Sequence, residues 1–164
     1  MNIEDRIRLK IKYRFHINWI EVGCQPNLSL DFIKEFFDNF NVIDLIINQE
    51  LPEDFIEEKI IPICCSGIWL SLATHQDLSE NFIRKYKENI LYWSRICQFQ
   101  KLSHDFIVEH KDYVNFLTLA RHKKLNIKTL KYILNLPNKD QYDIWVPLCY
   151  FNNISYEKSW KTFL

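Results

Sequence analysis

The chain has 164 residues, of which 48% are apolar and 26% charged, and its 21 basic and 21 acidic side chains cancel. This composition excludes a disordered chain and indicates one globular domain, without a net charge to attract nucleic acid or an anionic membrane. Only two glycines are present, Gly23 and Gly67, so the glycine-rich loops of nucleotide-binding folds and most two-residue β-hairpins are excluded.

The first segment, residues 1–27, is predicted to form a cap unit at the start of a helical array. It opens with charged residues, and no apolar leader is recognisable, so we expect no signal peptide. Five basic side chains suit a solvated end face. They are Arg6, Arg8, Lys10, Lys12 and Arg14.

Residues 28–153 contain an internal repeat. The hexamer Leu-Ser-Leu-Asp-Phe-Ile at 28–33 recurs in related form at 51–56, 78–83 and 102–107, with a degenerate copy at 125–130. Ser29, Ser79 and Ser103 are placed to cap the N-terminus of a helix, and the aspartates that follow suit its first turn. Each copy therefore predicts the start of a helix.

A second helix is predicted in each repeat. Apolar residues fall 12, 15 and 18 positions after the leading leucine, which gives Ile90, Trp93 and Ile96 in one copy. In the first copy the same count gives Phe40, Ile43 and Ile46, whereas the second copy needs a three-residue insertion near residues 62–66. The tryptophans at this register, Trp69, Trp93 and Trp145, are expected in the core.

These elements predict an all-α fold: a short α-solenoid of about six stacked helix-turn-helix repeats of about 24 residues. We expect a single domain over residues 1–164, with repeats at 28–153 and a C-terminal cap at 154–164.

Candidate chemistry is sparse. Cys64, Cys65, His75 and Cys97 form the only cluster worth testing for zinc, and adjacent cysteines do not have the usual ligand spacing. No signature pairs a cysteine with a histidine base; His104 is expected to face solvent and His110 to lie at the core edge. We therefore predict no catalytic residue, metal or cofactor, and five reduced cysteines that act as core residues of a cytoplasmic protein.

Charge is unevenly distributed along the chain. Residues 28–59 carry a net charge of −7 and residues 60–164 a net charge of +5. Such segments are typical of solvated helix faces, and they also suit an acidic surface that meets a basic groove or a basic edge that meets phosphates. Exposed aromatic side chains beside an arginine add a candidate hot spot. The candidate partner-binding residues are Glu53, Asp54, Glu57, Glu58, Tyr92, Arg95, Phe99, Arg121, Lys123 and Lys124.

The repeat resembles a known group of proteins. Units of the form Leu-Ser-x-Asp-Phe-Ile, followed by a Trp-x-x-Ile helix and a glutamine before the next unit, resemble short helical repeats found in proteins of phages and large DNA viruses. Trp93, Ile96 and Gln100 follow this pattern in full, and Trp69, Leu72 and Gln76 follow it with one substitution. The resemblance covers residues 28–124 and implies a viral or phage interaction protein in the host cytoplasm.

Three functions remain open on these grounds. The first is a non-enzymatic binding protein whose partner is a protein, such as a host defence factor inhibited in an anti-CRISPR-like manner or a regulatory factor. The second is a nucleic-acid-binding protein that uses the basic residues 121–131. The third is a nucleic-acid mimic that uses the acidic residues 31–58. No membrane partner is expected, and the oligomeric state is left open.

Overall fold

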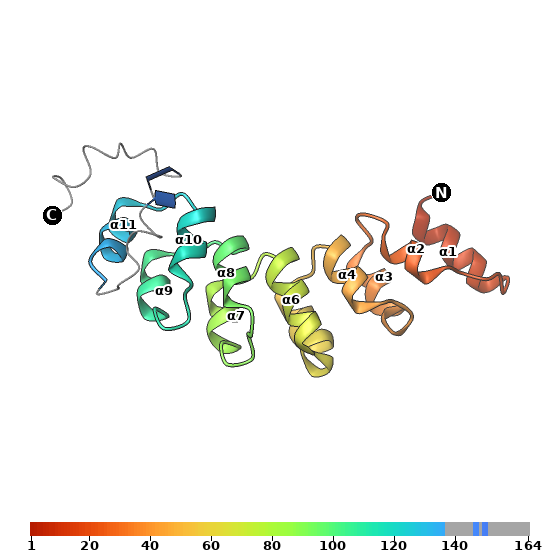
Figure 1. Cartoon of the computed structure of the whole chain (residues 1–164). Coiled ribbons are helices and arrows are strands. Elements are labelled where there is room, and N and C mark those ends of the chain that lie inside the picture. Colours follow the sequence, from red (N-terminus) through yellow and green to blue (C-terminus); the bar gives the residue numbers. More distant parts are fainter. Residues whose placement is uncertain (137–145, 148, 151–164) are drawn as a thin grey trace. The chain divides into compact units, whose positions relative to one another are not determined.

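The computed structural model describes residues 1–136, 146–147 and 149–150, which are drawn as ribbon in Figure 1. The chain divides into two compact units. Unit 1 comprises residues 1–77 and unit 2 comprises residues 78–164. Every regular element of the described residues is helical, which confirms the all-α prediction. None of the helices in this part of the chain is long and apolar enough to cross a membrane.

Unit 1 contains six α-helices and three short irregular helical segments among its described residues. In chain order the elements are α1 (Ile3–Lys12), α2 (Trp19–Gly23), α3 (Leu30–Glu35), η1 (Phe37–Asn39), α4 (Val42–Asn48), α5 (Glu53–Phe55), η2 (Ile56–Ile60), η3 (Ile61–Ile63) and α6 (Ser66–His75). The segments η1 and η3 are 3₁₀-helices, and η2 is a π-helix.

The described part of unit 2 contains five α-helices. Its elements are α7 (Glu80–Lys85), α8 (Trp93–Phe99), α9 (His104–Glu109), α10 (Phe116–His122) and α11 (Ile127–Leu134). Trp145 and the expected C-terminal cap at 154–164 lie outside the described residues.

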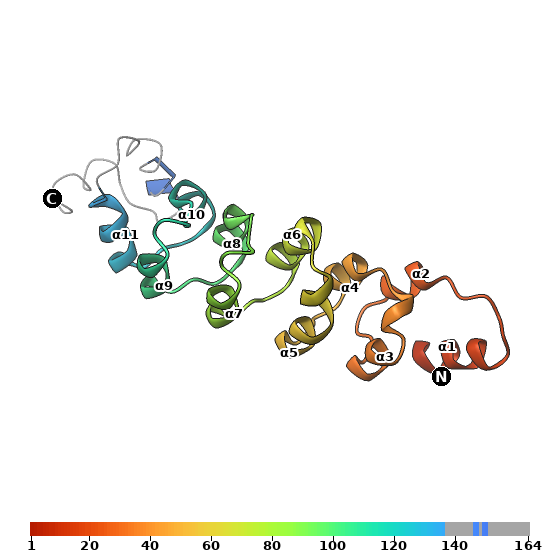
Figure 2. The ribbon, with the colours of Figure 1, turned by 90° about the horizontal axis from the view of Figure 1, so that it is seen from below.

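Helices of the same kind form a layer within each unit. The helices that begin at the repeated hexamer, which we call first helices, are α3, α5, α7, α9 and α11; the helices that follow them, the second helices, are α4, α6, α8 and α10. The cap-unit helix α2 packs on α4 and α4 on α6, while in unit 2 α8 packs on α10 and α9 on α11. Figure 2 shows α3 and α5 on the opposite side of unit 1 from α4 and α6, and α7 and α9 on the opposite side of unit 2 from α8 and α10.

The first helices begin as the sequence predicts. The hydroxyl oxygens of Ser29, Ser79 and Ser103 accept hydrogen bonds from the backbone N–H three residues ahead, at 3.1–3.2 Å. Each bond satisfies one of the N–H groups that the first turn of a helix leaves without a partner. Asn126 caps α11 in the same way, so the degenerate fifth copy keeps the helix start although it lacks the serine.

Three buried glutamines bind backbone groups at the ends of repeats. Gln49, Gln76 and Gln100 each follow directly after a second helix, and each accepts a hydrogen bond from the backbone N–H of the leucine that opens its own repeat. The amide nitrogen of Gln76 also donates to the carbonyl oxygens of Ile46 and Gln49, at 2.6 and 2.7 Å. Gln49 likewise donates to the carbonyl oxygens of Gly23 and Gln25. Because buried backbone groups need partners, Gln49 and Gln76 act as latches between repeats, and we call all three side chains latch glutamines.

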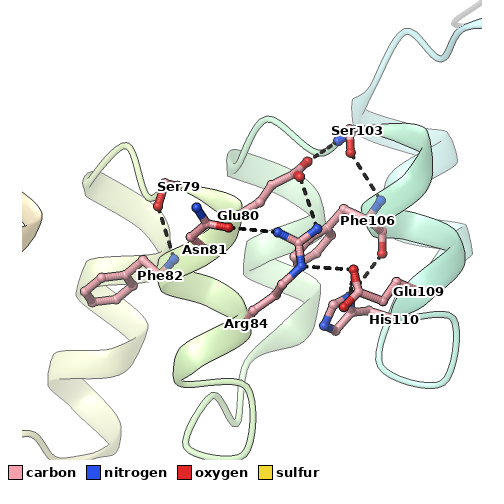
Figure 3. A network of polar contacts seen from close by, with 9 residues as sticks. All are labelled: Ser79, Glu80, Asn81, Phe82, Arg84, Ser103, Phe106, Glu109 and His110. Atoms are coloured by element: carbon pink, nitrogen blue, oxygen red, sulfur yellow. Dashed lines mark hydrogen bonds and ion pairs between the residues drawn. The ribbon is translucent and has the colours of Figure 1, made fainter.

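A carboxylate–arginine network adds a second link between repeats and occurs in both units. In unit 2, Glu80 accepts from the backbone N–H of Ser103 at 2.5 Å, and Arg84 lies 2.9 Å from Glu109 and over the ring of Phe106 (Figure 3). In unit 1 the same roles fall to Glu4, Arg8, Glu35, Ser29 and Phe32. The N-terminal segment, expected to expose its basic residues, therefore uses Arg8 to hold the first repeat.

The second repeat is longer than its neighbours, and the extra residues are found in its helices. Helix α6 begins at Ser66 and has ten residues, whereas α4 and α8 have seven, which agrees with an insertion near residues 62–66. Its first helix changes from α to π at Ile56. A π-turn holds one more residue than an α-turn. In other first helices the fourth residue after the repeated phenylalanine packs near it, as Phe36 does with Phe32. In the second repeat that place is taken by the fifth residue, the buried Ile60.

The core confirms most of the predicted apolar positions and corrects one. Trp69 and Trp93 are buried, and the Trp93 ring packs against Phe106 and His110 with ring centroids 6.4 and 5.9 Å away. Ile43, predicted to be buried, is 37% exposed. The reason is a difference in where the two helices begin. Counted from the leading leucine of its repeat, Asn41, the N-cap of α4, lies one residue earlier than Tyr92, the N-cap of α8, so Ile43 takes the second position of its helix and not the first.

Candidate interaction surfaces

The cap-unit helix α2 and the second helices α4, α8 and α10 present equivalent positions to solvent. Each begins directly after its N-cap residue, so its positions can be counted from that cap. In α2, α4, α8 and α10 the caps are Asn18, Asn41, Tyr92 and Asn115. In α4 the fourth and fifth residues are buried, so the second, third, sixth and seventh residues form the outer face of the helix. What differs between units is the chemistry at these positions.

In unit 1 the outer positions are apolar and acidic. The second residue of α2 and of α4 is isoleucine, and the third is an acid, Glu21 or Asp44. Ile20 is 64% exposed, and Ile47, the sixth residue of α4, is 45% exposed. We call this surface the acidic–apolar face. It comprises Ile20, Glu21, Ile43, Asp44 and Ile47.

In unit 2 the same positions include two arginines and no acid. The third residue of α8 is Arg95, and the sixth residue of α10 is Arg121; both are exposed. Phe99, the seventh residue of α8, is 42% exposed. Because α8 and α10 pack side by side, three of the predicted partner-binding residues lie on one surface, the basic–aromatic face. It comprises Arg95, Phe99 and Arg121, with His122 and Lys124 beside them.

Two other predicted residues of unit 2 have structural roles. Tyr92 is half-buried and precedes α8 as its N-cap residue. Lys123 follows directly after α10, where the other second helices have a latch glutamine. Burial lowers the pKa of Lys123, and the neighbouring Lys101 lowers it further, against an opposing effect of Cys97. Lys123 therefore belongs to the repeat junction more than to the solvent-facing surface.

The predicted acidic cluster lies at the start of the first helix of the second repeat. Asp54 and Glu58 are exposed, whereas Glu53 and Glu57 are partly covered. Glu58 forms an ion pair with Lys59 at 2.9 Å. This cluster lies in the first-helix layer, whereas the acidic–apolar face lies on the second helices, so unit 1 carries two separate acidic surfaces.

The cysteines and histidines occupy varied environments. Cys97 is buried, as predicted for all five cysteines, and Cys149 is also buried. The prediction is wrong for Cys24 and Cys65, which are exposed because they lie at the end of α2 and at the N-cap of α6. The backbone N–H groups of Ile68 and Gly67 lower the pKa of the Cys65 thiol, whereas burial raises the pKa of Cys64 to about 11.

The two histidines that were assigned from the repeat register differ in outcome. His110 is buried at the core as predicted, and its Nδ1 lies 3.1 Å from the carbonyl oxygen of Phe106. His104 is only partly exposed, because it contacts the hydroxyl of Thr129 at 3.2 Å and the edge of Tyr132. Among the described residues no three His, Cys, Asp or Glu side chains are grouped to hold a metal ion.

A small hollow lies between α1 and α2 and is lined by residues that include Ile3, Ile7 and Val22. Its volume is about 80 Å³. Pockets for small molecules usually measure about 300–1,000 Å³, so this hollow suits a few water molecules better than an organic ligand.

Sequence reasoning missed the acidic–apolar face. Counting from the leading leucine assigned Ile43 to the core, and Ile20 lies in the cap unit, where no repeat was aligned. The available signal was the pair of asparagines, Asn18 and Asn41, each followed by two apolar residues and an acid. Aligning the second helices on these caps would have placed both isoleucines outside.

Comparisons with protein families, with curated proteins and with solved structures gave no match to this chain.

Proposed function

We propose that the protein is a non-enzymatic helical-repeat binding protein whose partner is another protein. The observation that carries this proposal is the acidic–apolar face. Ile20, Ile43 and Ile47 expose apolar surface to water on adjacent helices. Apolar side chains in a row with charged neighbours are typical of protein interaction sites.

The scaffold supports the same proposal. The latch glutamines and the capping serines use their polar groups on the backbone, and they recur from repeat to repeat. This recurrence supports the stacking of about six repeats into a short α-solenoid, which we keep as part of the proposal. In such arrays the interior is devoted to packing, and binding is left to the outer surface.

Resemblance to helical-repeat proteins of phages and large DNA viruses supports a partner in a host cell. We propose that binding inhibits that partner, which would be a defence or regulatory protein. The acidic cluster at Glu53, Asp54, Glu57 and Glu58 would contribute by attracting a basic partner surface, since complementary charge accelerates association.

The basic–aromatic face favours a second candidate function, the binding of single-stranded nucleic acid. Arg95 and Arg121 supply positive charge, and the exposed ring of Phe99 provides a surface on which a base can stack. The acidic character of unit 1 opposes this, because a nucleic acid that extended along it would be repelled. We therefore rank the protein partner first.

Affinity capture with the full-length chain tests the proposal. Lysate of the host cell is divided, and one half is treated with nuclease before capture. We expect one protein to be retained in both halves. Retention that is lost after nuclease treatment, together with salt-sensitive binding of a fluorescent oligothymidine that requires Arg95, Phe99 and Arg121, would contradict the protein partner and favour nucleic acid.

Charge reversal provides a second, independent test of the protein partner. Replacing Glu53, Asp54, Glu57 and Glu58 by lysine should slow association with the captured protein, because steering is weakened. Neutralising Arg121, Lys123 and Lys124 should leave that association within about twofold. The reverse result would show that the basic segment carries the function.

A further inference from the structure

We propose that the acidic–apolar face of unit 1 binds an amphipathic helix of the partner, apolar on one side and flanked by lysine or arginine. This inference rests on the proposed function and names the chemistry of the partner segment. It is argued from the packing of α2 and α4, from the exposed isoleucines and from the unpaired acids beside them.

Helices α2 and α4 approach each other closely enough to form one surface. Gly23 of α2 lies close to α4: a Cβ atom there would lie 3.4 Å from the Phe40 ring and 3.8 Å from the Cβ of Asp44. Ile20 on α2 and Ile43 and Ile47 on α4 therefore belong to two helices in direct contact. Two adjacent helices leave a seam between them, and a third helix can pack its side chains into such a seam.

The acids beside this surface lack ion pairs. Glu21 and Asp44 each come one residue after an exposed isoleucine, and Glu50 is exposed just beyond α4. None of these three carboxylates pairs with a basic side chain among the described residues. Residues 16–77 contain 11 acidic residues and only two basic ones, Lys34 and Lys59, both in the first-helix layer.

These features define the ligand. A purely apolar segment would leave the carboxylates without partners, and a purely basic segment would leave the isoleucines in water. An amphipathic helix satisfies both, because apolar residues at every third or fourth position can contact the isoleucines while flanking lysines reach the acids. The described chain presents no strand edge, so addition of an extended strand is not available here.

A generic peptide tests the chemistry without knowledge of the natural partner. The probe is a fluorescein-labelled helix of about 14 leucine and lysine residues in an amphipathic order. Its controls are a scrambled peptide of equal composition and a leucine–glutamate helix. Fluorescence anisotropy at physiological salt should show binding of the amphipathic basic helix and weaker binding of both controls. Equal binding of the scrambled peptide would overturn the inference.

Variants of the full-length chain locate the binding site. The triple change Ile20→Ser, Ile43→Ser and Ile47→Ser should weaken binding by about tenfold or more. Glu21→Gln with Asp44→Asn should weaken it by about threefold to tenfold and reduce its salt dependence.

The matched control is Asp31→Asn with Asp38→Asn. It removes two exposed acids of the same unit that lie on α3 and η1, away from the proposed face. Binding should be unchanged. If this control weakens binding as much as the change at Glu21 and Asp44, the peptide is held by net charge alone and the inference is wrong.

Further measurements keep the outcome clear. Circular dichroism checks the fold of each variant, and Ile20→Ser alone replaces the triple change if that variant is unfolded, because Ile20 is the most exposed of the three. A dimer of the wild type that the triple change converts to monomer would identify a second copy as the occupant and overturn the inference. Capture of the host protein that survives the triple change would leave the proposed function intact and refute only this site.

Discussion

The two units share one scaffold and differ in the charge of their surfaces. Glu4 and Arg8 hold the first repeat of unit 1, and Glu80 and Arg84 hold a later repeat in unit 2 in the same way. The corresponding bonds have nearly equal lengths. Yet unit 1 has 13 acidic and seven basic residues, net −6, and unit 2 has eight acidic and 14 basic residues, net +6. The repeat thus separates packing, which is conserved between units, from surface chemistry, which is reversed.

The largest expected effect concerns the core of unit 2. Trp93→Ala should lower the free energy of unfolding by about 3–5 kcal/mol, because it removes a large side chain packed on Phe106, His110 and Tyr113. Urea unfolding followed by circular dichroism measures the loss. Trp93→Phe should cost much less, because the indole N–H of Trp93 has no hydrogen-bond partner. A loss below about 1 kcal/mol for the alanine variant would contradict the core assignment.

The latch of unit 1 should be nearly as important as the core. Gln76→Leu leaves the N–H of Leu51 and the carbonyl oxygens of Ile46 and Gln49 buried without these partners. We expect a loss of about 2–4 kcal/mol in the same unfolding experiment. Gln25→Leu is the control, because its side chain makes one exposed bond to a carbonyl at 3.2 Å, and it should change stability by less than about 0.5 kcal/mol.

Unit 2 offers the opposite test of the latch, because Lys123 stands in the latch position. Lysine has no acceptor, so it cannot bind the backbone N–H of Leu102 as Gln100 binds that of Leu78. Lys123→Gln should therefore stabilise the chain by about 1 kcal/mol, also by removing a partly buried charge. A destabilised variant in urea would show that the glutamine latch does not extend to this repeat.

The smallest effect on stability is expected at the exposed thiol. Cys65 should react with iodoacetamide at lower pH than Cys64 and Cys97, since backbone N–H groups lower its pKa, whereas burial raises the pKa of Cys64 and of Cys97 to about 11. Mass spectrometry after timed labelling between pH 6 and about 9 measures the order. Cys65→Ser should leave unfolding unchanged, and labelling of Cys97 in the folded chain would contradict its burial.

Much of the scaffold could be predicted because local chemistry fixes it. The capping serines and the buried tryptophans follow from a helix start and a period of three to four residues, and both are visible in the sequence. The glutamines recur visibly at 49, 76 and 100, but the role of Gln49 and Gln76 depends on backbone groups of another repeat, which no local pattern reveals.

The surfaces were predicted only in outline. Segment charge identified one acidic and one basic region, but the pairing of Arg84 with Glu109 and the burial of Lys123 depend on neighbours in space. Ile43 shows how small a shift in helix register separates a core position from an exposed one. A difference of one residue between repeats turns a helical side chain by about 100°, which is enough to move it from the core to the solvent.

The π-helix of residues 56–60 bears on how such a gene can change length. A single inserted codon within an α-helix normally rotates every later side chain away from its contact, so it is expected to be lost by selection. Here the wider turn contains the extra residue, and the buried Ile60 still reaches the core. Because Gln76 fixes the end of the second repeat independently of its first helix, extra residues can be accommodated between these two anchor points. Copies of 23, 24 and 27 residues can therefore coexist in one chain.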